Sequence, residues 1–445
     1  MSIADLFLRS AAALSRNQPA PDVSDDVRAF LSALEYLDGD RAVSNSRARL
    51  LAAAATLGRL FRLASPDAPG LFFFGGEADP AIDSAKLRGA PIASVSGAGT
   101  TPAKAFESCV GEAVEYLSQY ATEEDTLERA SFREQASAMG ESARDYVARL
   151  LESVGVSADQ TIDWVRAQRL GDGVAAPFPA DIFLRRRATA QDFSAPFKLS
   201  TGCGAGASFE AAALHGLLEL IERDAASLWW RGGSRGRSLP AESLAMRAAC
   251  ELLTQIRGAA GTRFSWLLDI TTDLGVPCVA AISARRDGLG FACGLSARLS
   301  TEAAAISAVL EMGQMELAHH IVEAKRRERG DAALNAGDLN HLERGTRIDT
   351  ATCELLYPRG LAAPVAEGVQ LDAARNLEGL VARLAAAGIE VFALNLSRHR
   401  FAIPVARVLS PQLQLEPSPL MTERLLRAMR QAGEAGVRTL EIALF

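Results

Sequence analysis

Two glutamates inside an apolar helix constrain this chain more than any other feature. Glu219 and Glu222 are three residues apart, and the apolar residues Leu217, Leu218, Leu220 and Ile221 flank them. On a helix this spacing puts both carboxylates on one face, where like charges repel. An apolar setting adds a desolvation penalty unless a partner compensates the charge. The fold must therefore supply a positive partner, and a bound divalent cation is one that removes the penalty.

A second pair makes this interpretation stronger than one pair would, because a single Glu-x-x-Glu is more often a solvated helix face. Glu112 and Glu115 have the same spacing in a similarly apolar segment. Magnesium binds few carboxylates directly and completes its octahedron with water and phosphate oxygens. Two carboxylate pairs that face a triphosphate therefore form a coherent site. Arg223 can neutralise phosphate charge, and the glycines of Ser200–Gly206 permit close backbone approach to an anion.

Strands and long helices alternate from about Ile92 onward, which is typical of α/β or α+β proteins. We expect strands at 264–269, 276–283, 391–396 and 403–409, and helices at 102–120, 208–230, 301–327 and 420–434. Segments 266–277 and 392–404 share a plan of strand, polar turn and proline. That internal similarity favours two pseudo-symmetric halves.

The N-terminal region differs from the rest. Residues 1–70 read as helical, with an amphipathic run at Leu50–Leu63. Two prolines and a glycine in Ser65–Gly70 end any helix there, and a short buried strand is expected at Leu71–Gly75. We therefore divide the chain into a helical N-terminal region, 1–85, and a larger domain, 86–445.

The composition excludes several classes of function. A formal net charge of −7 lacks the positive field that non-specific nucleic-acid binding needs. The basic runs Arg185–Arg187 and Lys325–Arg327 are interpreted as solvated surface. No stretch approaches the ~18–20 apolar residues of a membrane span, and the N-terminus is not a signal peptide. The six cysteines form no CxxC pair, so we expect buried free thiols in a cytoplasmic protein without a membrane partner.

Other nucleotide and catalytic motifs are missing from the sequence. There is no Walker A motif, no GxGxxG fingerprint, no HExxH and no serine elbow. We name no catalytic general base from the sequence.

The run Ser200–Ala225 resembles the YcaO family, whose members are ATP-dependent enzymes that modify peptide backbone amides. It matches the small-residue loop and the E-x-x-E-R helix of the family, and the resemblance extends from about residue 86 to 415. The segment Asp269–Pro277 also resembles the family. The resemblance implies a YcaO-like fold around a nucleotide site, with ATP and Mg²⁺ as cofactors.

Residue by residue, the resemblance assigns the site. Ser108, Glu112 and Glu115 fall on the S-x-x-x-E-x-x-E motif, which contacts nucleotide and magnesium in the family. Glu219 and Glu222 match the second magnesium pair. Arg223 matches the phosphate-binding arginine of the family, and Glu311 matches a nucleotide-site glutamate on a later helix. The implied magnesium ligands are Glu112, Glu115, Glu219 and Glu222.

Four positions depart from the family pattern. A basic residue, an asparagine, a glutamate and an arginine are replaced by Ala98, Ala207, Ala211 and Ser307. Two cationic contacts are thereby lost, and charge-assisted hydrogen bonds contribute about 1.5–3 kcal/mol each. Lys104 lies one helical turn before Ser108, and we treat it as a candidate replacement.

The activity that the resemblance implies begins when a nucleophile adds to an amide carbonyl of a precursor peptide. ATP then phosphorylates the carbonyl oxygen, and phosphate departs. A Cys, Ser or Thr nucleophile gives an azoline by cyclodehydration, whereas external sulfide gives a thioamide. Many azoline-forming members end in a proline-rich tail, but no proline follows Pro419 here.

The resemblance also implies partners. They are the precursor peptide and a leader-peptide-binding or TfuA-like protein that delivers the peptide or sulfur. Residues 1–85 are then a docking region or a stabilising extension, and a homodimer is the default assembly. Two other readings stay open. One is a non-catalytic scaffold, which needs no repelling glutamates, and the other is a different magnesium-dependent ligase or phosphotransferase.

Overall fold

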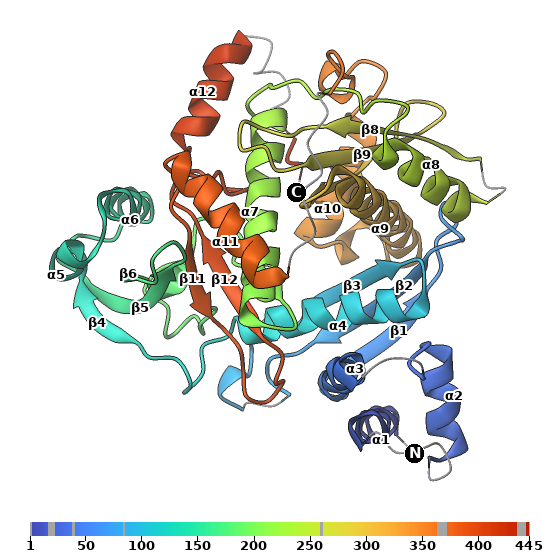
Figure 1. The fold of residues 1–445 in the computed structure, drawn as a ribbon, viewed down its shortest axis with the longest axis horizontal. Helices are drawn as coiled ribbons and strands as arrows, with labels where there is room; N and C mark the ends of the chain where they lie inside the picture. The colour runs from blue at the N-terminus through green and yellow to red at the C-terminus, as the bar shows by residue number, and fades with distance from the viewer. Residues whose placement is uncertain are drawn as a thin grey trace.

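A central helix organises the molecule. The structure, a computed structural model, describes residues 2–16, 23–37, 41–82, 85–258, 261–362, 372–433 and 442–444. Helix α7 (Phe209–Trp230) stands at the centre of Figure 1, and sixteen of its 22 residues are buried. An Ala- and Leu-rich helix of this kind is apolar on all sides, as expected for one that protein surrounds.

Three antiparallel sheets surround this helix. Their strand orders are β1-β2-β3, β10-β9-β8 and β4-β5-β11-β12-β7, with β6 paired to β5. The strands of the first two sheets are β1 (Arg59–Leu63), β2 (Phe72–Ala78), β3 (Ala93–Gly99), β8 (Arg263–Asp269), β9 (Cys278–Arg285) and β10 (Ala292–Ala297). The third sheet contains β4 (Glu128–Ser131), β5 (Thr161–Arg169), β6 (Ala175–Pro179), β7 (Cys203–Ala205), β11 (Phe392–Asn395) and β12 (Val405–Leu409).

Each sheet ends in an edge strand that leads into a long helix. Strand β3 precedes α4 (Pro102–Ser118), β7 precedes α7, and β10 precedes α9 (Thr301–Arg329). The pairs β8–β9 and β11–β12 occupy equivalent places beside β10 and β7. The similarity between segments 266–277 and 392–404 therefore has a structural basis. The structure shows three such units, however, in place of two halves.

In each unit the strand and its helix pack at backbone distance. A Cβ added to Gly97, Gly204 or Gly294 would lie 2.3, 2.5 or 2.2 Å from a carbonyl oxygen of the following helix. No side chain fits in that space, so glycine is required at all three positions. This close approach brings side chains of the helix next to backbone N–H groups of the strand.

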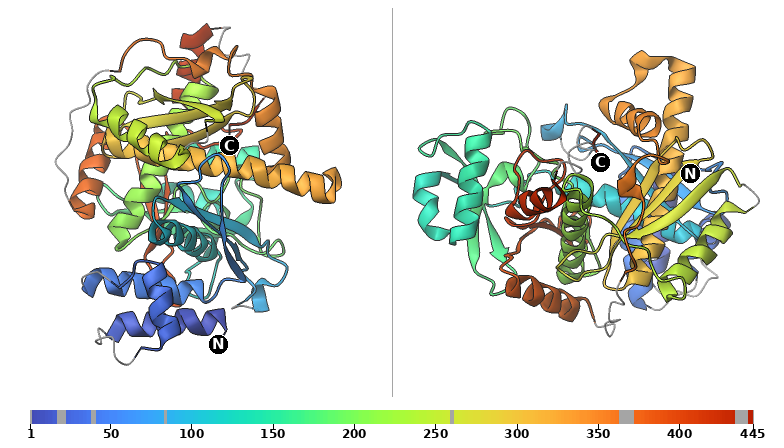
Figure 2. Two further views of the ribbon diagram at one scale, coloured as in Figure 1. Left: turned by 90° about the vertical axis from the view of Figure 1, so that its right-hand side faces the viewer. Right: turned by 90° about the horizontal axis from the view of Figure 1, so that it is seen from above.

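The N-terminal helices form their own layer. Helices α1 (Ile3–Arg16), α2 (Asp25–Ala33) and α3 (Arg41–Ala54) lie below the first sheet in Figure 1 and in the left view of Figure 2. Phe106 of α4 contacts the rings of Phe7 and Tyr36, which joins this layer to the rest. The first sheet crosses residue 85, since β2 pairs with β3.

The prediction of helix through Leu63 is wrong from Ala55 onward. Helix α3 ends at Ala54, and β1 pairs with β2 from Arg59 to Leu63. The spacing of Leu60 and Leu63 fits the helical period. As a strand, however, this segment satisfies its backbone hydrogen bonds by pairing with β2, and Leu60 and Leu63 still pack against the core. For short apolar runs that fit both a helix and a strand, pairing with a neighbouring strand decides the secondary structure.

The other predicted elements are confirmed within the described residues, although residue 434 of the last predicted helix lies outside them. The remaining helices are α5 (Phe132–Gln135), α6 (Glu141–Ser153), α8 (Leu244–Arg257), α10 (Ala336–Arg347), α11 (Ala373–Ala386) and α12 (Glu423–Ala432). All six cysteines are free thiols, of which Cys109, Cys203 and Cys278 are buried. In the part of the chain that the structure describes, no helix has the length and apolar character needed to cross a membrane.

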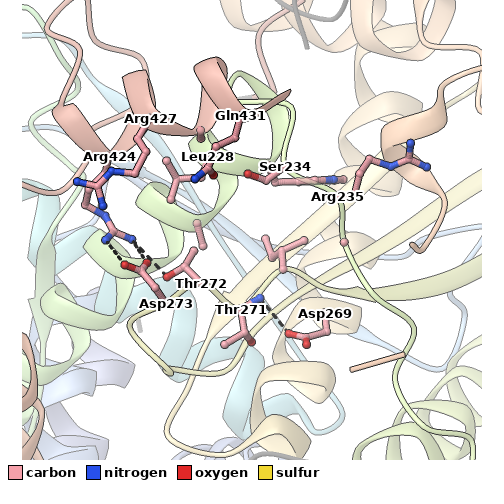
Figure 3. Close-up of a pocket in the computed structure, with 15 residues that line it drawn as sticks. Leu228, Ser234, Arg235, Asp269, Thr271, Thr272, Asp273, Arg424, Arg427 and Gln431 are labelled. Atoms are coloured by element: carbon pink, nitrogen blue, oxygen red, sulfur yellow. Dashed lines mark hydrogen bonds and ion pairs between the residues drawn. The ribbon is translucent and has the colours of Figure 1, made fainter. Parts of the chain in front are cut away.

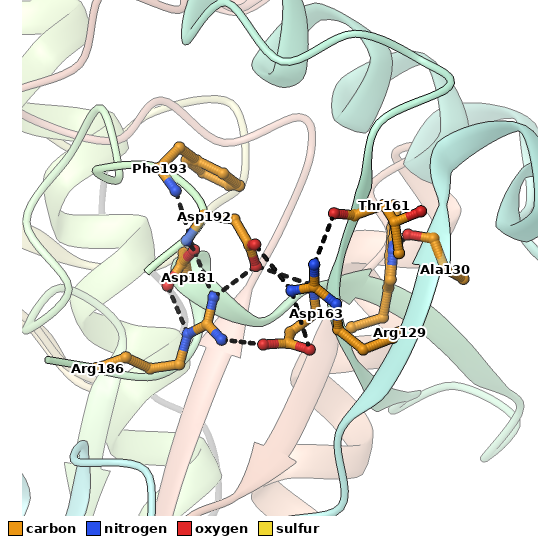
Figure 4. A network of polar contacts seen from close by, with 9 residues as sticks. Arg129, Ala130, Thr161, Asp163, Asp181, Arg186, Asp192 and Phe193 are labelled. Carbon is orange, nitrogen blue, oxygen red and sulfur yellow. Dashed lines mark hydrogen bonds and ion pairs between the residues drawn. The ribbon is translucent and has the colours of Figure 1, made fainter. Parts of the chain in front are cut away.

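One basic run is not the solvated surface that the sequence suggested. The Arg186 side chain is 3% exposed and donates to Asp181 at 2.7 Å and to Asp192 at 2.8 Å, with Asp163 as a third partner. Arg129 bridges Asp163 and Asp192 from the other side (Figure 4). Three aspartates, 5 to 23 residues away along the chain, provide this burial, so no local pattern indicates it.

Candidate functional site

Three glutamates, one from each unit, bind the backbone of their own strand. The acceptors are Glu112, Glu219 and Glu311, and the N–H donors are Ser96 at 2.8 Å, Gly202 at 3.0 Å and Leu295 at 3.0 Å. The three contacts repeat at sequence separations of 16, 17 and 16 residues. The close strand–helix packing described above makes these bonds possible.

The residue three positions later in each helix reaches the next unit. Glu115 accepts from Ala205 N–H at 2.7 Å, and Glu222 accepts from Ala297 N–H at 3.2 Å. Gln314 donates to the Ser96 hydroxyl at 3.5 Å and completes the ring. The two carboxylates of each pair share one helix face, as their i, i+3 spacing predicted, and contacts between the units bring the two pairs together.

These carboxylates lie in a poorly solvated place. Burial raises the pKa of Glu115 and of Glu222 to about 8, and it also raises the pKa of Glu219 and Glu311. Glu112 is exposed on one side, yet desolvation still raises its pKa to about 7. The negative charge of Glu219 adds to the shifts at Glu112, Glu115 and Glu222. Ionisation of these carboxyls is therefore disfavoured in the free protein, and a cation that stabilises their charged form is the ligand that this site favours.

Arg223 is the main positive neighbour. Its Nη2 lies 3.7 Å from Glu219 Oε1 and 3.6 Å from Glu222 Oε1. Arg298 follows β10, donates to the Ala297 carbonyl at 2.8 Å and is a further positive neighbour of Glu222 and Glu311. Sequence reasoning found Arg223 from its motif but missed Arg298, which lies far from the glutamate pairs along the chain.

Arg407 is a second cation that the sequence did not reveal. It lies on β12 opposite Cys203 and is fully buried. None of its three guanidinium nitrogens has a hydrogen-bond partner among the described residues. Burial lowers the pKa of Arg407 to about 10, and Glu219 is one of the negative groups that act against this shift. A charged residue in a strand that reads as apolar was the signal available in the sequence.

A cavity of about 950 Å³ opens beside the carboxylates, and its lining includes Glu115, Glu219, Glu222 and Arg223. Its far wall is α11, whose residues Arg375, Gly379 and Arg383 share one helix face. A cavity of this size accepts a ligand as large as a nucleotide.

Ser108 lies one turn before Glu112 and is exposed, outside the cavity lining. Lys104 is also exposed, at the first turn of α4, and does not line the cavity either. Four residues depart from the family pattern, and they lie on different elements. Ala98 is on β3, Ala207 precedes α7, Ala211 is in the first turn of α7 and Ser307 is on α9. Besides Arg223, the cavity lining contains three arginines that the sequence analysis did not name, Arg298, Arg375 and Arg383.

The residues present fit magnesium with phosphate, in contrast to a metal held by protein alone. Within the described residues, no three His, Cys, Asp or Glu side chains converge closely enough to hold an ion. Pairs of carboxylates that leave the remaining positions to water and phosphate oxygens are the pattern that magnesium takes in nucleotide sites. The desolvated, mutually repelling glutamates supply the negative charge for it.

Asp224, which follows the E-x-x-E-R motif in α7, has a structural role. Asp224 is fully buried, and Arg424 of α12 binds it at 2.9 Å and Asp273 at 2.7 Å. Asp269, Thr271 and Asp273 line a separate cavity of about 330 Å³ (Figure 3). This cavity contains none of the glutamates above, so the first half of the Asp269–Pro277 segment joins α7 to α12. The second half, Gly275–Pro277, lines the carboxylate cavity.

Comparison with known families agrees with this geometry. The model of a family described as YcaO cyclodehydratase, ATP- and Mg²⁺-binding, matches residues 96–414. This match covers most of the chain and includes the long helices of all three units, α4, α7 and α9. The protein belongs to the YcaO family, and ATP and Mg²⁺ are the cofactors of that family.

Solved structures share the fold. A heterocyclase in complex with substrate and cofactor matches with a TM-score of 0.65 at 22% identity, over 81% of this chain and 50% of that one. The YcaO protein of Methanopyrus kandleri, bound with AMPPCP and Mg²⁺, matches with a TM-score of 0.57 at 20% identity, over 83% of this chain and 89% of that one. The E. coli microcin synthetase McbBCD complex matches with a TM-score of 0.57 at 17% identity, covering 80% and 88% of the respective chains.

A relative by sequence is an uncharacterized protein of Methanothermobacter thermautotrophicus strain Delta H. It is 27% identical over 268 residues, which are 57% of this chain and 66% of that protein. The chain thus spans just under two thirds of this relative and about half of the first heterocyclase.

Proposed function

We propose that this protein uses Mg²⁺ and ATP to activate a backbone amide of a ribosomally made precursor peptide, most directly for cyclodehydration of Cys, Ser or Thr to an azoline. The observation that carries the proposal is the ring of converging, poorly solvated carboxylates beside a cavity of nucleotide size. Bound Mg²⁺–ATP supplies the phosphoryl group that makes an amide oxygen a good leaving group.

The protein contributes binding and charge neutralisation. Glu112, Glu115, Glu219 and Glu222 would hold magnesium, and their bonds to strand N–H groups fix the direction of each carboxylate. Arg223 would neutralise phosphate oxygens, with Glu311 and Ser108 as further nucleotide contacts. Positioning and electrostatic stabilisation are the main catalytic effects in phosphoryl transfer.

Thioamide formation with a sulfur-delivering, TfuA-like partner is the alternative outcome at the same site, because the activated amide is common to both. The fold similarity to a microcin synthetase complex supports a multi-protein assembly. Helices α1–α3, which form a separate layer, are the proposed docking region for the precursor or its delivery protein.

Calorimetry of ATP binding, with and without Mg²⁺, tests the site. We expect magnesium-dependent binding by the wild type and its loss in Glu219→Ala/Glu222→Ala. The matched control is Glu323→Ala/Glu328→Ala, which removes two exposed glutamates of α9. Equal binding by all three proteins would show that the carboxylate ring is not the nucleotide site. Absence of binding by the wild type would support the scaffold reading instead.

A further inference from the structure

A second cavity continues from the carboxylates along the same face of α7. Glu219, Glu222 and Arg223 are followed on this face by Ala226 and Trp230, at helical spacing. Ala226 and Trp230 line a cavity of about 590 Å³. The rise of an α-helix places Trp230 about 12 Å along the axis from Glu222. The cavity therefore begins where the carboxylate site ends.

The walls of this cavity are rigid and largely apolar. Pro196, Pro417 and Pro419 line it together with the buried rings of Phe197 and Trp230. The Trp230 indole is held by stacking on Phe291, with ring centroids 6.1 Å apart. The Arg231–Glu416 ion pair adds a neutralised polar edge. Proline and aromatic walls of this kind are typical of sites that hold extended peptide.

Side chains around the cavity already bind the backbone of a peptide segment. The Trp230 indole N–H donates to the Ile442 carbonyl at 2.8 Å, and Arg344 donates to the Leu444 carbonyl at 3.1 Å. Residues Ile442–Leu444 form part of the lining and leave the rest of the volume open. Donors that bind main-chain carbonyls recognise peptide without regard to side-chain identity.

One lysine faces this space in a chain that otherwise prefers arginine. The sequence has four lysines, Lys86, Lys104, Lys198 and Lys325. Lys86 and Lys325 pair with Glu123 and Asp338, whereas Lys198 lines the cavity with Arg223 and Arg344 as charged neighbours. A flexible ammonium group at this point can donate to the oxygen of a bound carbonyl.

We propose that this cavity is the acceptor subsite, which holds an extended segment of the substrate peptide with its backbone carbonyls toward Lys198 and its reacting amide toward Arg223. The inference rests on the proposed function, because it places the second substrate next to the nucleotide site. It further identifies main-chain carbonyls, in preference to particular side chains, as what the subsite recognises.

Amidination of lysines by methyl acetimidate, followed by mass spectrometry, tests this subsite, since four lysines give four separate rates. The full chain is loaded with Mg²⁺–AMPPCP, and the probe is the peptide acetyl-Gly-Ala-Cys-Ala-Gly-amide at millimolar concentration. We expect the peptide to slow the modification of Lys198 about threefold when it is present at about twice its Kd, by simple mass action. The rates at Lys86, Lys104 and Lys325 should not change.

Two matched variants control the measurement. Pro419→Trp adds a large ring to the lining of the cavity and should abolish the protection of Lys198. Protection is measured as the ratio of the Lys198 modification rates without and with peptide. Pro358→Trp adds the same ring at an exposed proline outside the cavity and should retain the protection. N-acetylcysteine amide, which has the side chain without the flanking backbone, should protect less than the peptide.

The outcomes separate this inference from the proposed function. If calorimetry shows ATP binding but the peptide leaves the Lys198 rate unchanged, or slows all four lysines equally, the acceptor subsite is overturned and the proposed function stands. Protection of Lys198 without any ATP binding would overturn the proposed function and support the peptide subsite. Equal protection in Pro419→Trp and Pro358→Trp would also contradict the subsite.

Discussion

Two groups of buried charge in this protein differ in how that charge is balanced. Around Arg186, three aspartates meet two arginines, and every partner is within hydrogen-bond or ion-pair distance (Figure 4). Around Arg223, five glutamates converge, and the Arg223 Nη2 atom lies 3.7 Å from Glu219 and 3.6 Å from Glu222. Burial raises the pKa values of the glutamates, whereas hydrogen bonds lower that of Asp192. The first group is complete without a ligand, and the second leaves a charge for a ligand to balance.

Of the changes considered, replacement of Arg186 in the arginine–aspartate group should lower the stability of the protein most. Arg186→Met leaves Asp181, Asp163 and Asp192 without their common partner in a buried place. We expect the free energy of unfolding to fall by about 3–5 kcal/mol, as when a buried ion pair loses one member. Urea unfolding measures this loss. Arg187→Met, next to it on the exposed surface, is the control and should change the stability little.

The opposite result is expected at the carboxylate ring. Glu222→Gln keeps the shape and removes a carboxyl that burial keeps protonated in the folded protein but that ionises in the unfolded chain, so the free protein should gain about 1–2 kcal/mol. The same change should weaken magnesium-dependent ATP binding about 10- to 100-fold, because a charged contact is lost. Thermal unfolding and calorimetry on the same sample give both values. A variant that loses stability and keeps its ATP affinity would contradict the assigned role.

The two groups should also respond to pH in opposite directions. Glu115 and Glu222 have folded-state pKa values of about 8, above the usual 4.5, so the unfolded chain releases these protons first as pH rises. Stability without ligand should therefore decrease between about pH 4.5 and 8. The pKa of Asp192 is lowered, because bonds from Asp163 N–H and Arg186 outweigh burial, so its contribution is present above pH 3.8 and is lost in acid.

Thermal unfolding from acid to alkaline pH checks this comparison. Glu222→Gln should flatten the decrease toward pH 8 and leave the acid side unchanged. Saturating Mg²⁺–ATP should flatten it as well, because ligand binding favours the ionised carboxylates. A wild-type stability that rises from pH 5 to 8 without ligand would show that these glutamates are not buried as described.

A smaller effect is expected at Arg298, which flanks the ring and lines the cavity. Arg298→Met should weaken ATP binding about threefold to tenfold and weaken AMP binding less, since fewer phosphates are then contacted. Arg427→Met, at the separate cavity of Figure 3, is the control and should change neither affinity. Equal losses for ATP and AMP would place Arg298 away from the phosphates.

Part of this arrangement could be predicted from local sequence. The i, i+3 spacing of the glutamates and their apolar flanks predicted two desolvated pairs, and the glycines before α7 predicted a close backbone approach. The first is seen in the raised pKa values of the glutamates, whereas the glycines approach the backbone of α7 itself and their contact with an anion stays a prediction. The bonds from Glu115 to Ala205 and from Glu222 to Ala297 join different units, so they follow from tertiary packing that no local pattern contains.

Dependence on tertiary packing also explains which features the sequence did not reveal. Arg407 and Arg298 approach the ring from strands far along the chain, and Arg186 becomes buried because three separate aspartates surround it. Strand β1 forms because β2 offers it an edge, although its residues also fit a helix. Magnesium ligands and nucleotide contacts of individual residues stay predictions until binding is measured.

The order of the strands also bears on how the protein is made. Strand β7 is paired with β12, which leaves the ribosome about 200 residues later, whereas β3 and β10 follow their own sheets directly. Helix α7 therefore emerges long before its sheet is complete, with its apolar faces and two buried glutamates unmatched. A nascent chain that lacks β12 contains the strands of the first two sheets but leaves β7 unpaired, so the backbone donor that Glu115 binds on β7 gains its support late in synthesis.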